Sequence, residues 1–328
     1  MFRSWLLLFV LLTAVGCSET ADSNAPGTGP SKPVRLSARL ALNWYPETEH
    51  GGFIAANTLG LFDEKNVDVE IIPGGPGAPQ LVITELKAER IQFAVSDADN
   101  VVKARAVGLP IVAVMAPLQN SPRCIMVHES SGITRLEDLA NVELAISDSR
   151  PFALWMKKKL PLTNVTMVPF SGQVGEFLVK QNFAQQGYVF SEPFVAKEKG
   201  GDPKVLLLSD IGFNPYASVL ITTEQVIKEQ PELVRSVVSA SLKGWERYLA
   251  DPAATNAAIH EMNKEMSPAA LEFGAREMVP LCKTAEGVPS CGMILDRWQT
   301  LVSQIEELDD IPKGSVKPEE CFTTQFLP

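Results

Sequence analysis

Residues 36–72 read LSARLALNWYPETEHGGFIAANTLGLFDEKNVDVEII, and this stretch indicates the fold. It begins with an apolar run at 36–42, which predicts a strand, and continues into a helix predicted over 52–65. The segment 67–72 then alternates apolar and acidic residues with a period of two, as a half-buried strand does. Two strands joined through a helix of this length predict parallel neighbours with the helix packed on the sheet.

The same alternation of short apolar runs and amphipathic segments continues to about residue 208. Further strands are predicted at 93–95, 111–115, 124–127, 143–146, 165–168, 187–190, 204–208 and 218–221, and further helices at 78–88, 100–107, 152–160, 174–181 and 193–199. Beyond residue 221 almost only helices are predicted, with start signals at Pro231, Pro252 and Pro268 and a last helix over 293–308. The chain therefore belongs to the α/β class and ends in a helical tail.

Two polar, turn-rich segments interrupt this pattern, at 117–122 and at 210–215. If the chain crosses between two bodies at both places, lobe 1 contains residues 34–118 plus 216–328 and lobe 2 contains residues 122–211. Two lobes joined by two crossovers enclose a cleft, which is a preferred place for a ligand. They also close on each other by hinge motion.

The N-terminal residues predict export. Residues 5–12 are apolar, too few for the roughly 20 residues of a membrane span but suited to a secretory signal. Ala14-Val15-Gly16-Cys17 resembles a bacterial lipobox, although Ala14 stands where Leu is more usual. A signal peptide over 1–16 and lipidation of Cys17 follow; the alternative is an ordinary signal with an incidental cysteine. Residues 17–33 are rich in Ser, Thr, Gly and Pro and predict a flexible tether. The protein is thus expected to be lipid-anchored at the cell envelope.

Composition narrows the function classes. The formal net charge is −10 and no strong basic cluster exists, which argues against nucleic acid as a partner. No GxSxG, HExxH, GxGxxG or P-loop motif occurs, so no catalytic residue, metal or cofactor is predicted. Beyond Cys17 the cysteines have no metal-binding spacing. Cys282 and Cys291 flank a Gly/Pro-containing loop and are the expected pair if a disulfide forms in an oxidising compartment.

The loop after the first strand holds the strongest ligand-binding signal. Ligands gather at the carboxyl ends of strands in open α/β sheets, and this loop carries Asn43, Trp44, Tyr45 and His50. Trp44 and Tyr45 offer flat faces for stacking on an aromatic solute. The alternative is that Trp44 simply fills the core of its lobe.

Later strands supply further candidates. Glu192 follows a predicted strand, and its carboxylate can accept two N–H bonds from an aminopyrimidine. Alternatively, Glu192 only favours the positive end of the next helix. Ser171 precedes a helix whose N–H groups can hold a polar group, and the glycines around Gly75 either admit a ligand or form a plain turn. The ligand-binding candidates are Asn43, Trp44, Tyr45, His50, Gly75, Ser96, Ser171, Tyr188 and Glu192.

An ordered set of motifs resembles the thiamine pyrimidine synthase-like family of ABC-importer solute-binding proteins. The motifs are Leu42-Asn43-Trp44-Tyr45-Pro46, His50-Gly51-Gly52-Phe53, Gly60-Leu61-Phe62, Ile72-Pro73-Gly74-Gly75, Phe93-Ala94-Val95-Ser96, Ala104-Arg105-Ala106-Val107-Gly108-Leu109-Pro110, Ser191-Glu192-Pro193-Phe194, Pro231-Glu232-Leu233-Val234 and Gly244-Trp245 with Tyr248-Leu249-Ala250-Asp251-Pro252. The resemblance covers nearly all of residues 34–300. It implies the type II periplasmic-binding-protein fold: two α/β lobes, a hinge and a helical tail packed on lobe 1.

The resemblance also implies a function. It predicts a monomeric receptor that delivers a small heterocycle, such as a thiamine pyrimidine precursor, to an ABC permease. A receptor for riboflavin, nitrate or a sulfonate remains an alternative, as does a pyrimidine-forming enzyme that consumes its own histidine. His50 matches a functional histidine of the enzyme branch, but the clustered cysteine motif of that branch is missing here. Trp44 and Glu192 favour a flat, amine-bearing solute.

Overall fold

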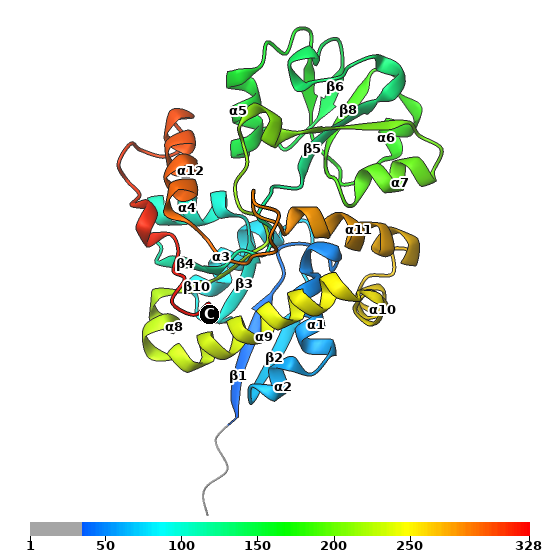
Figure 1. Cartoon of the computed structure of the whole chain (residues 1–328). Coiled ribbons are helices and arrows are strands. Elements are labelled where there is room, and N and C mark those ends of the chain that lie inside the picture. Colours follow the sequence, from blue (N-terminus) through cyan, green and yellow to red (C-terminus); the bar gives the residue numbers. More distant parts are fainter. Residues whose placement is uncertain (1–34) are drawn as a thin grey trace, which may run out of the picture. The chain divides into compact units, whose positions relative to one another are not determined.

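The computed structural model describes residues 35–328, so the predicted signal peptide, tether and Cys17 lie outside the described residues. Two five-stranded sheets organise the described chain (Figure 1), with strand orders β2-β1-β3-β10-β4 and β7-β6-β8-β5-β9. The first sheet consists of β1 (Leu36–Ala41), β2 (Val67–Ile72), β3 (Phe93–Ser96), β4 (Ile111–Met115) and β10 (Val219–Thr223). The second consists of β5 (Arg123–His128), β6 (Glu143–Ala145), β7 (Thr166–Val168), β8 (Phe183–Tyr188) and β9 (Pro203–Leu207).

Helices accompany both sheets. Lobe 1 denotes the first sheet with α1 (Gly51–Thr58), α2 (Leu61–Glu64), α3 (Ala78–Lys87), α4 (Ala98–Ala106), α8 (Glu224–Glu229), α9 (Pro231–Ala250), α10 (Ala253–Met262), α11 (Pro268–Leu281) and α12 (Leu295–Glu307). Lobe 2 denotes the second sheet with α5 (Pro151–Lys159), α6 (Gly175–Val179) and α7 (Glu192–Glu198). The predicted α/β fold with two lobes and a helical tail is confirmed. The residue boundaries predicted for the lobes stay a prediction.

Both sheets are mixed, so the prediction of parallel neighbours holds for only some of the strand pairs. β1 pairs in parallel with β2 and β3, but β10 runs antiparallel to β3 and β4. Likewise β6 pairs in parallel with β7 and β8, whereas β5 runs antiparallel to β8 and β9. β5 and β10 each follow one of the two crossovers. The chain therefore reaches these strands from the other lobe and not from a helix that packs on the same sheet.

Two predicted elements differ most from the structure. The helix predicted over 52–65 is divided into α1 and α2, because Gly60 between them adopts a left-handed φ of 70°. The strand predicted over 187–190 is wrong, since β8 spans Phe183–Tyr188. Its polar residues Gln185 and Gln186 interrupt the apolar pattern, yet both are buried, because β8 lies between β5 and β6 inside the sheet.

The two crossovers lie side by side. Leu118 and Ala217 form an isolated antiparallel bridge. The backbone N–H of Ser121 donates to Asn214 Oδ1 at 2.7 Å, which links the outgoing and returning segments again. This paired connection is the arrangement expected of a hinge.

Close packing of α9 on α1 positions the loop that precedes α1. A Cβ atom at Gly51 would lie 2.1 Å from the ring of Tyr248, and one at Gly52 would lie 2.1 Å from the ring of Trp245. Only glycine permits the two aromatic rings to rest on the first turn of α1. The loop ahead of α1 is therefore fixed against the helical tail of lobe 1.

The described cysteines, Cys124, Cys282, Cys291 and Cys321, are free and buried. The expected Cys282–Cys291 disulfide is thus not formed in this structure. Its loop is closed by the backbone instead, since the N–H of Ser290 donates to the Cys282 carbonyl at 3.0 Å. No helix within residues 35–328 combines the length and apolar character needed to cross a membrane.

Candidate functional site

The candidate site lies where the strands of lobe 1 end. β1 and β3 are parallel neighbours, so the loop at 42–50 and the turn from β3 into α4 at Asp97 lie at the same edge of the sheet. Lobe 2 contributes Arg123 and Tyr188, which are direct partners in the pairing of β5 with β8. Arg150, immediately before α5, completes the contribution of lobe 2.

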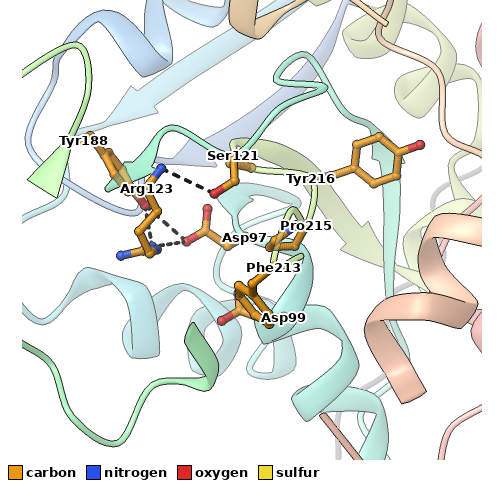
Figure 2. A pocket seen from close by; sticks show the side chains of 9 residues that line it. Asp97, Asp99, Ser121, Arg123, Tyr188, Phe213, Pro215 and Tyr216 are labelled. Carbon is orange, nitrogen blue, oxygen red and sulfur yellow. Dashed lines mark hydrogen bonds and ion pairs between the residues drawn. The ribbon is translucent and has the colours of Figure 1, made fainter. Parts of the chain in front are cut away.

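Asp97 of lobe 1 is held by lobe 2 (Figure 2). Arg123 Nη2 lies 3.2 Å from Asp97 Oδ2 and donates to the Tyr188 hydroxyl at 2.6 Å. The Tyr188 hydroxyl itself lies 3.4 Å from Asp97 Oδ2. Arg150 Nη2 lies 3.6 Å from the same oxygen and 3.7 Å from Asp99 Oδ2. The two arginines are therefore already neutralised by Asp97 and Asp99.

The space beside this network is small. A cavity of about 10 Å³ is lined by Asp97, Arg123, Tyr188 and the crossover segment 213–217. That volume has room for about one water molecule. The lobes thus meet across the site, and a ring-sized solute enters only when they separate.

His50 is buried inside its loop. The backbone N–H of Glu47 donates to His50 Nδ1 at 3.3 Å, so the ring proton sits on Nε2, which lies 2.9 Å from Asn43 Oδ1. Burial lowers the pKa of His50 to about 3, which keeps the ring neutral. Both ring nitrogens therefore make contacts within the loop and stabilise it. A contact of His50 or Asn43 with the solute stays a prediction.

Four buried or half-buried carboxyl groups gather near the lobe boundary. Burial raises the pKa of Glu49 to about 8, and the charge of Asp97 adds to the effect. Burial, then the charges of Glu49 and Glu192, raise the pKa of Glu47. Burial also raises the pKa of Asp97, which Arg123 opposes, and that of Glu192. The site is therefore acidic, and its carboxyls resist ionisation.

The aromatic loop faces lobe 2. Trp44 is half-buried and Tyr45 is exposed, with ring centroids 5.6 Å apart in an edge-to-face arrangement. A Cβ at Gly75 would lie 3.6 Å from the Tyr45 ring, and one at Gly172 of lobe 2 would lie 4.0 Å from Trp44. Trp44 thus lies at the lobe boundary and does not fill the core of lobe 1.

The remaining candidates divide into two groups. Tyr188 and Glu192 lie together, because Glu192 Oε2 accepts the backbone N–H of Tyr188 at 2.8 Å. A contact of Glu192 with the solute stays a prediction. Ser96 is fully buried, and its hydroxyl accepts from Asn100 Nδ2 at 3.2 Å. Ser171 is exposed and accepts the N–H of Gln173, so the structure does not bring it to the acidic groups.

Sequence reasoning missed the charged members of the site. Asp97 and Asp99 directly follow β3, so the rule that ligands gather at strand ends was a usable signal for both. Arg123 opens an apolar strand, and Arg150 stands alone before a helix, so neither carried a local signal. Among the described residues no group of three or more His, Cys, Asp or Glu side chains is arranged to hold a metal ion.

Comparison with known proteins finds relatives over most of the chain. The chain is 24% identical over 259 residues to the riboflavin-binding protein RibY of Chloroflexus aurantiacus, covering 75% of this chain and 73% of that protein. It is 23% identical over 333 residues to the formylaminopyrimidine-binding protein of Halalkalibacterium halodurans, covering 98% and 97%. Some relatives are instead named as pyrimidine phosphate synthases, one of them from Legionella pneumophila at 20% identity over 90% of this chain and 93% of that protein.

The fold is similar to that of the periplasmic aliphatic sulphonate binding protein SsuA of Escherichia coli. The TM-score is 0.66 at 16% identity, over 87% of this chain and 91% of that one. Residues 47–255 match the family model described as NMT1/THI5 like, which is more than half of the chain. The protein therefore belongs to the NMT1/THI5-like family.

Proposed function

We propose that this protein is the exported solute-binding component of an ABC importer and captures a small nitrogen heterocycle, such as a thiamine pyrimidine precursor, between its lobes. The observation that best supports this proposal is the position of Trp44 at the lobe boundary. The same boundary holds four acids that interact with one another: Glu47, Glu49, Asp97 and Glu192. An aromatic face and carboxylate acceptors are the two features that a flat, amine-bearing ring requires. Relatives named for riboflavin and formylaminopyrimidine support this class of solute.

The charge of the site argues against nitrate or a sulfonate. An anion entering it would be buried among carboxyl groups, and a buried charge without a partner of opposite charge is costly. The two arginines do not compensate, because both already face Asp97 and Asp99. A solute with N–H donors satisfies the same groups.

The state of His50 supports binding over a pyrimidine-forming reaction. A histidine that is consumed by a reaction must present a ring nitrogen to the reacting partner. Here both nitrogens of His50 are engaged inside the loop, and none of its side chain is exposed. We therefore assign His50 to the support of the loop and not to catalysis.

The sequence supports the remaining parts of the proposal. Lipidation of Cys17 would anchor the protein at the cell envelope, with residues 17–33 as the tether. A monomer with two hinged lobes would then present the closed, loaded form to a permease in the cytoplasmic membrane.

Calorimetric titration of the purified protein tests the proposal with a 4-aminopyrimidine, riboflavin, nitrate and an alkanesulfonate. Wild type should bind the aminopyrimidine. Trp44→Ala should weaken that binding by about 2 kcal/mol or more, since it removes a large aromatic contact. Glu192→Gln should cost about 1.5–3 kcal/mol, the value of a charge-assisted hydrogen bond.

Glu261→Gln is the matched control, because Glu261 is exposed on α10 with 75% of its side chain accessible. It should leave every affinity unchanged. Anion binding that tightens in Glu192→Gln, with no heterocycle bound by wild type, would replace this proposal with an anion receptor.

A further inference from the structure

We infer that Glu49 and Asp97 form a cation-binding subsite within the interlobe site, and that it receives a protonated amine carried by the solute. The inference rests on the proposed function and specifies its ligand further. A hydrogen-bond acceptor such as Glu192 is satisfied by any neutral amine, whereas this subsite selects a positive charge.

Each of the two carboxyl groups has an unused oxygen. Glu49 is 1% exposed and Asp97 is 6% exposed. Among residues 35–328, Asp97 Oδ1 has no hydrogen-bond partner. Glu49 Oε1 has none either, and its neighbour at 3.3 Å is His50 Nε2, whose proton faces Asn43 Oδ1 at 2.9 Å. Figure 2 shows Asp97 at the cavity, with one carboxyl oxygen joined to Arg123 by a dashed line. Buried polar atoms without a partner are costly, so these oxygens indicate a ligand with matching donors.

Ser218 connects the two acids through a strained backbone. It is fully buried and adopts a left-handed φ of 50°, which costs a non-glycine residue about 1 kcal/mol or more. Val219 pairs with Ser96, so Ser218 lies opposite Asp97. Its hydroxyl lies 3.1 Å from the Glu49 carbonyl oxygen and 3.3 Å from Glu49 Oε2, but it has only one proton to donate. Strain of this kind is retained at functional positions.

The surrounding charge leaves the pair short of positive partners. The titratable and charged groups around Glu49 and Asp97 are Glu47 and His50 of the same loop, Asp99 of α4, Arg123 of β5, Arg150 before α5, Tyr188 of β8 and Glu192 of α7. Of these, His50 is neutral and both arginines approach Asp97. A solute ammonium would give Glu49 a cationic partner with several N–H donors.

Binding of a cation should release a proton. Burial and the charge of Asp97 raise the pKa of Glu49 to about 8, so this carboxyl is mostly protonated at neutral pH. An ammonium beside it favours the carboxylate, and the proton then leaves to solvent. Glu49 is held by Ser218 and by His50, both of lobe 1, so it stays in this environment when the lobes part. Affinity for a cationic solute should therefore fall as pH falls below 8, by up to about tenfold per pH unit.

The test uses two probes that share a 4-aminopyrimidine ring and differ in one substituent. One carries a 5-aminomethyl group, which is cationic from pH 6 to 8, and the other a neutral 5-hydroxymethyl group. Titrations at pH 6, 7 and 8, in buffers with different heats of ionisation, give both affinity and the number of protons released. The shared ring cancels any effect of ring protonation when the two affinities are expressed as a ratio.

In wild type the aminomethyl probe should bind more tightly, and the affinity ratio should increase between pH 6 and 7 by up to about tenfold, with about one proton released per probe. Glu49→Gln should remove the pH dependence of the ratio and the proton release, whereas Glu261→Gln should retain both. Asp97→Asn should lower the same ratio and provides a second variant if the first does not fold.

Two outcomes overturn the inference. If both probes bind wild type with a constant affinity ratio and no proton release, the cation subsite is wrong while the heterocycle receptor stands. If neither probe binds and an anion does, the proposed function fails as well.

Discussion

Replacing Glu49 with Gln should flatten the pH dependence of stability in the ligand-free protein. Burial raises the pKa of Glu49 from the ordinary 4.5 to about 8 in the folded state. Between these values the folded chain binds one proton more than the unfolded chain, so stability falls as pH rises. The residue is 1% exposed, so solvent screening does little to reduce the effect.

His50 produces the opposite slope in a different pH range. Burial lowers its pKa from the ordinary 6.5 to about 3, so the unfolded chain takes up the extra proton below pH 6.5. Stability attributable to His50 is then lost as pH falls below 6.5. The two slopes, each about 1.4 kcal/mol per pH unit, cancel between pH 4.5 and 6.5 and leave Glu49 unopposed above that.

The diagnostic window is therefore pH 6.5 to 8. Across it Glu49 should cost wild type about 2 kcal/mol of unfolding free energy, or a few degrees in Tm. The raised pKa values of Glu47 and Asp97 act with the same sign. The measured quantity is therefore the difference in slope between wild type and Glu49→Gln.

Urea unfolding at four pH values across the window measures this difference, with Glu261→Gln as the control. Between pH 6.5 and pH 8, Glu49→Gln should lose about 2 kcal/mol less unfolding free energy than wild type. If both proteins lose the same unfolding free energy across the window, Glu49 is ionised in the folded state. The raised pKa of Glu49 would then be wrong.

Three further predictions concern packing, anchoring and closure. Gly52→Ala should destabilise lobe 1 by about 1–3 kcal/mol or more in urea unfolding, because its Cβ would lie 2.1 Å from the Trp245 ring. Gly175→Ala, with nothing within 4 Å of the added Cβ, should be neutral or slightly stabilising; equal losses in both would contradict the packing of α9 on α1. Cys17→Ala should move the protein from the membrane fraction to the soluble fraction, and a variant that still sediments with membranes would exclude Cys17 as the anchor. Small-angle scattering should show a more compact particle with a bound aminopyrimidine, and an unchanged radius of gyration at saturation would contradict hinged closure.

Most of the fold was predictable because the order of apolar and polar residues in its strands follows which side chains are buried. β2 and β4 have the bounds that apolar periodicity predicts, since one alternates and the other is buried on both faces. β8 was misplaced because Gln185 and Gln186 are buried as polar residues in the middle of a sheet. No sequence feature of β5 or β10 indicates that these strands run antiparallel to their neighbours. Their direction depends on the edge of the sheet at which the chain enters after each crossover.

The part of the candidate site that the sequence predicts consists of its aromatic and loop residues and Glu192. Trp44, Tyr45 and His50 cluster in one loop after one strand, so position along the chain was enough to group them. Arg123 meets Asp97 only because β5 of lobe 2 starts where the first crossover ends. Contacts of this kind depend on how the two lobes pack against each other. Secondary-structure periodicity in the sequence carries no information about that packing.

The position of the charged residues ties the electrostatics of the site to the hinge. Arg123 begins β5 directly after the outgoing crossover, and Ser218 stands directly before β10 after the returning one. When the lobes separate, Arg123 should move away from Asp97 while Ser218 keeps its contact with Glu49 within lobe 1. The open site then has the same acids and fewer nearby cations, so it attracts a cationic solute more strongly than the closed site does. As the lobes close, Arg123 returns to a site whose charge the solute has already balanced, and the Tyr188 hydroxyl, 3.4 Å from Asp97 Oδ2, provides a further contact between the lobes.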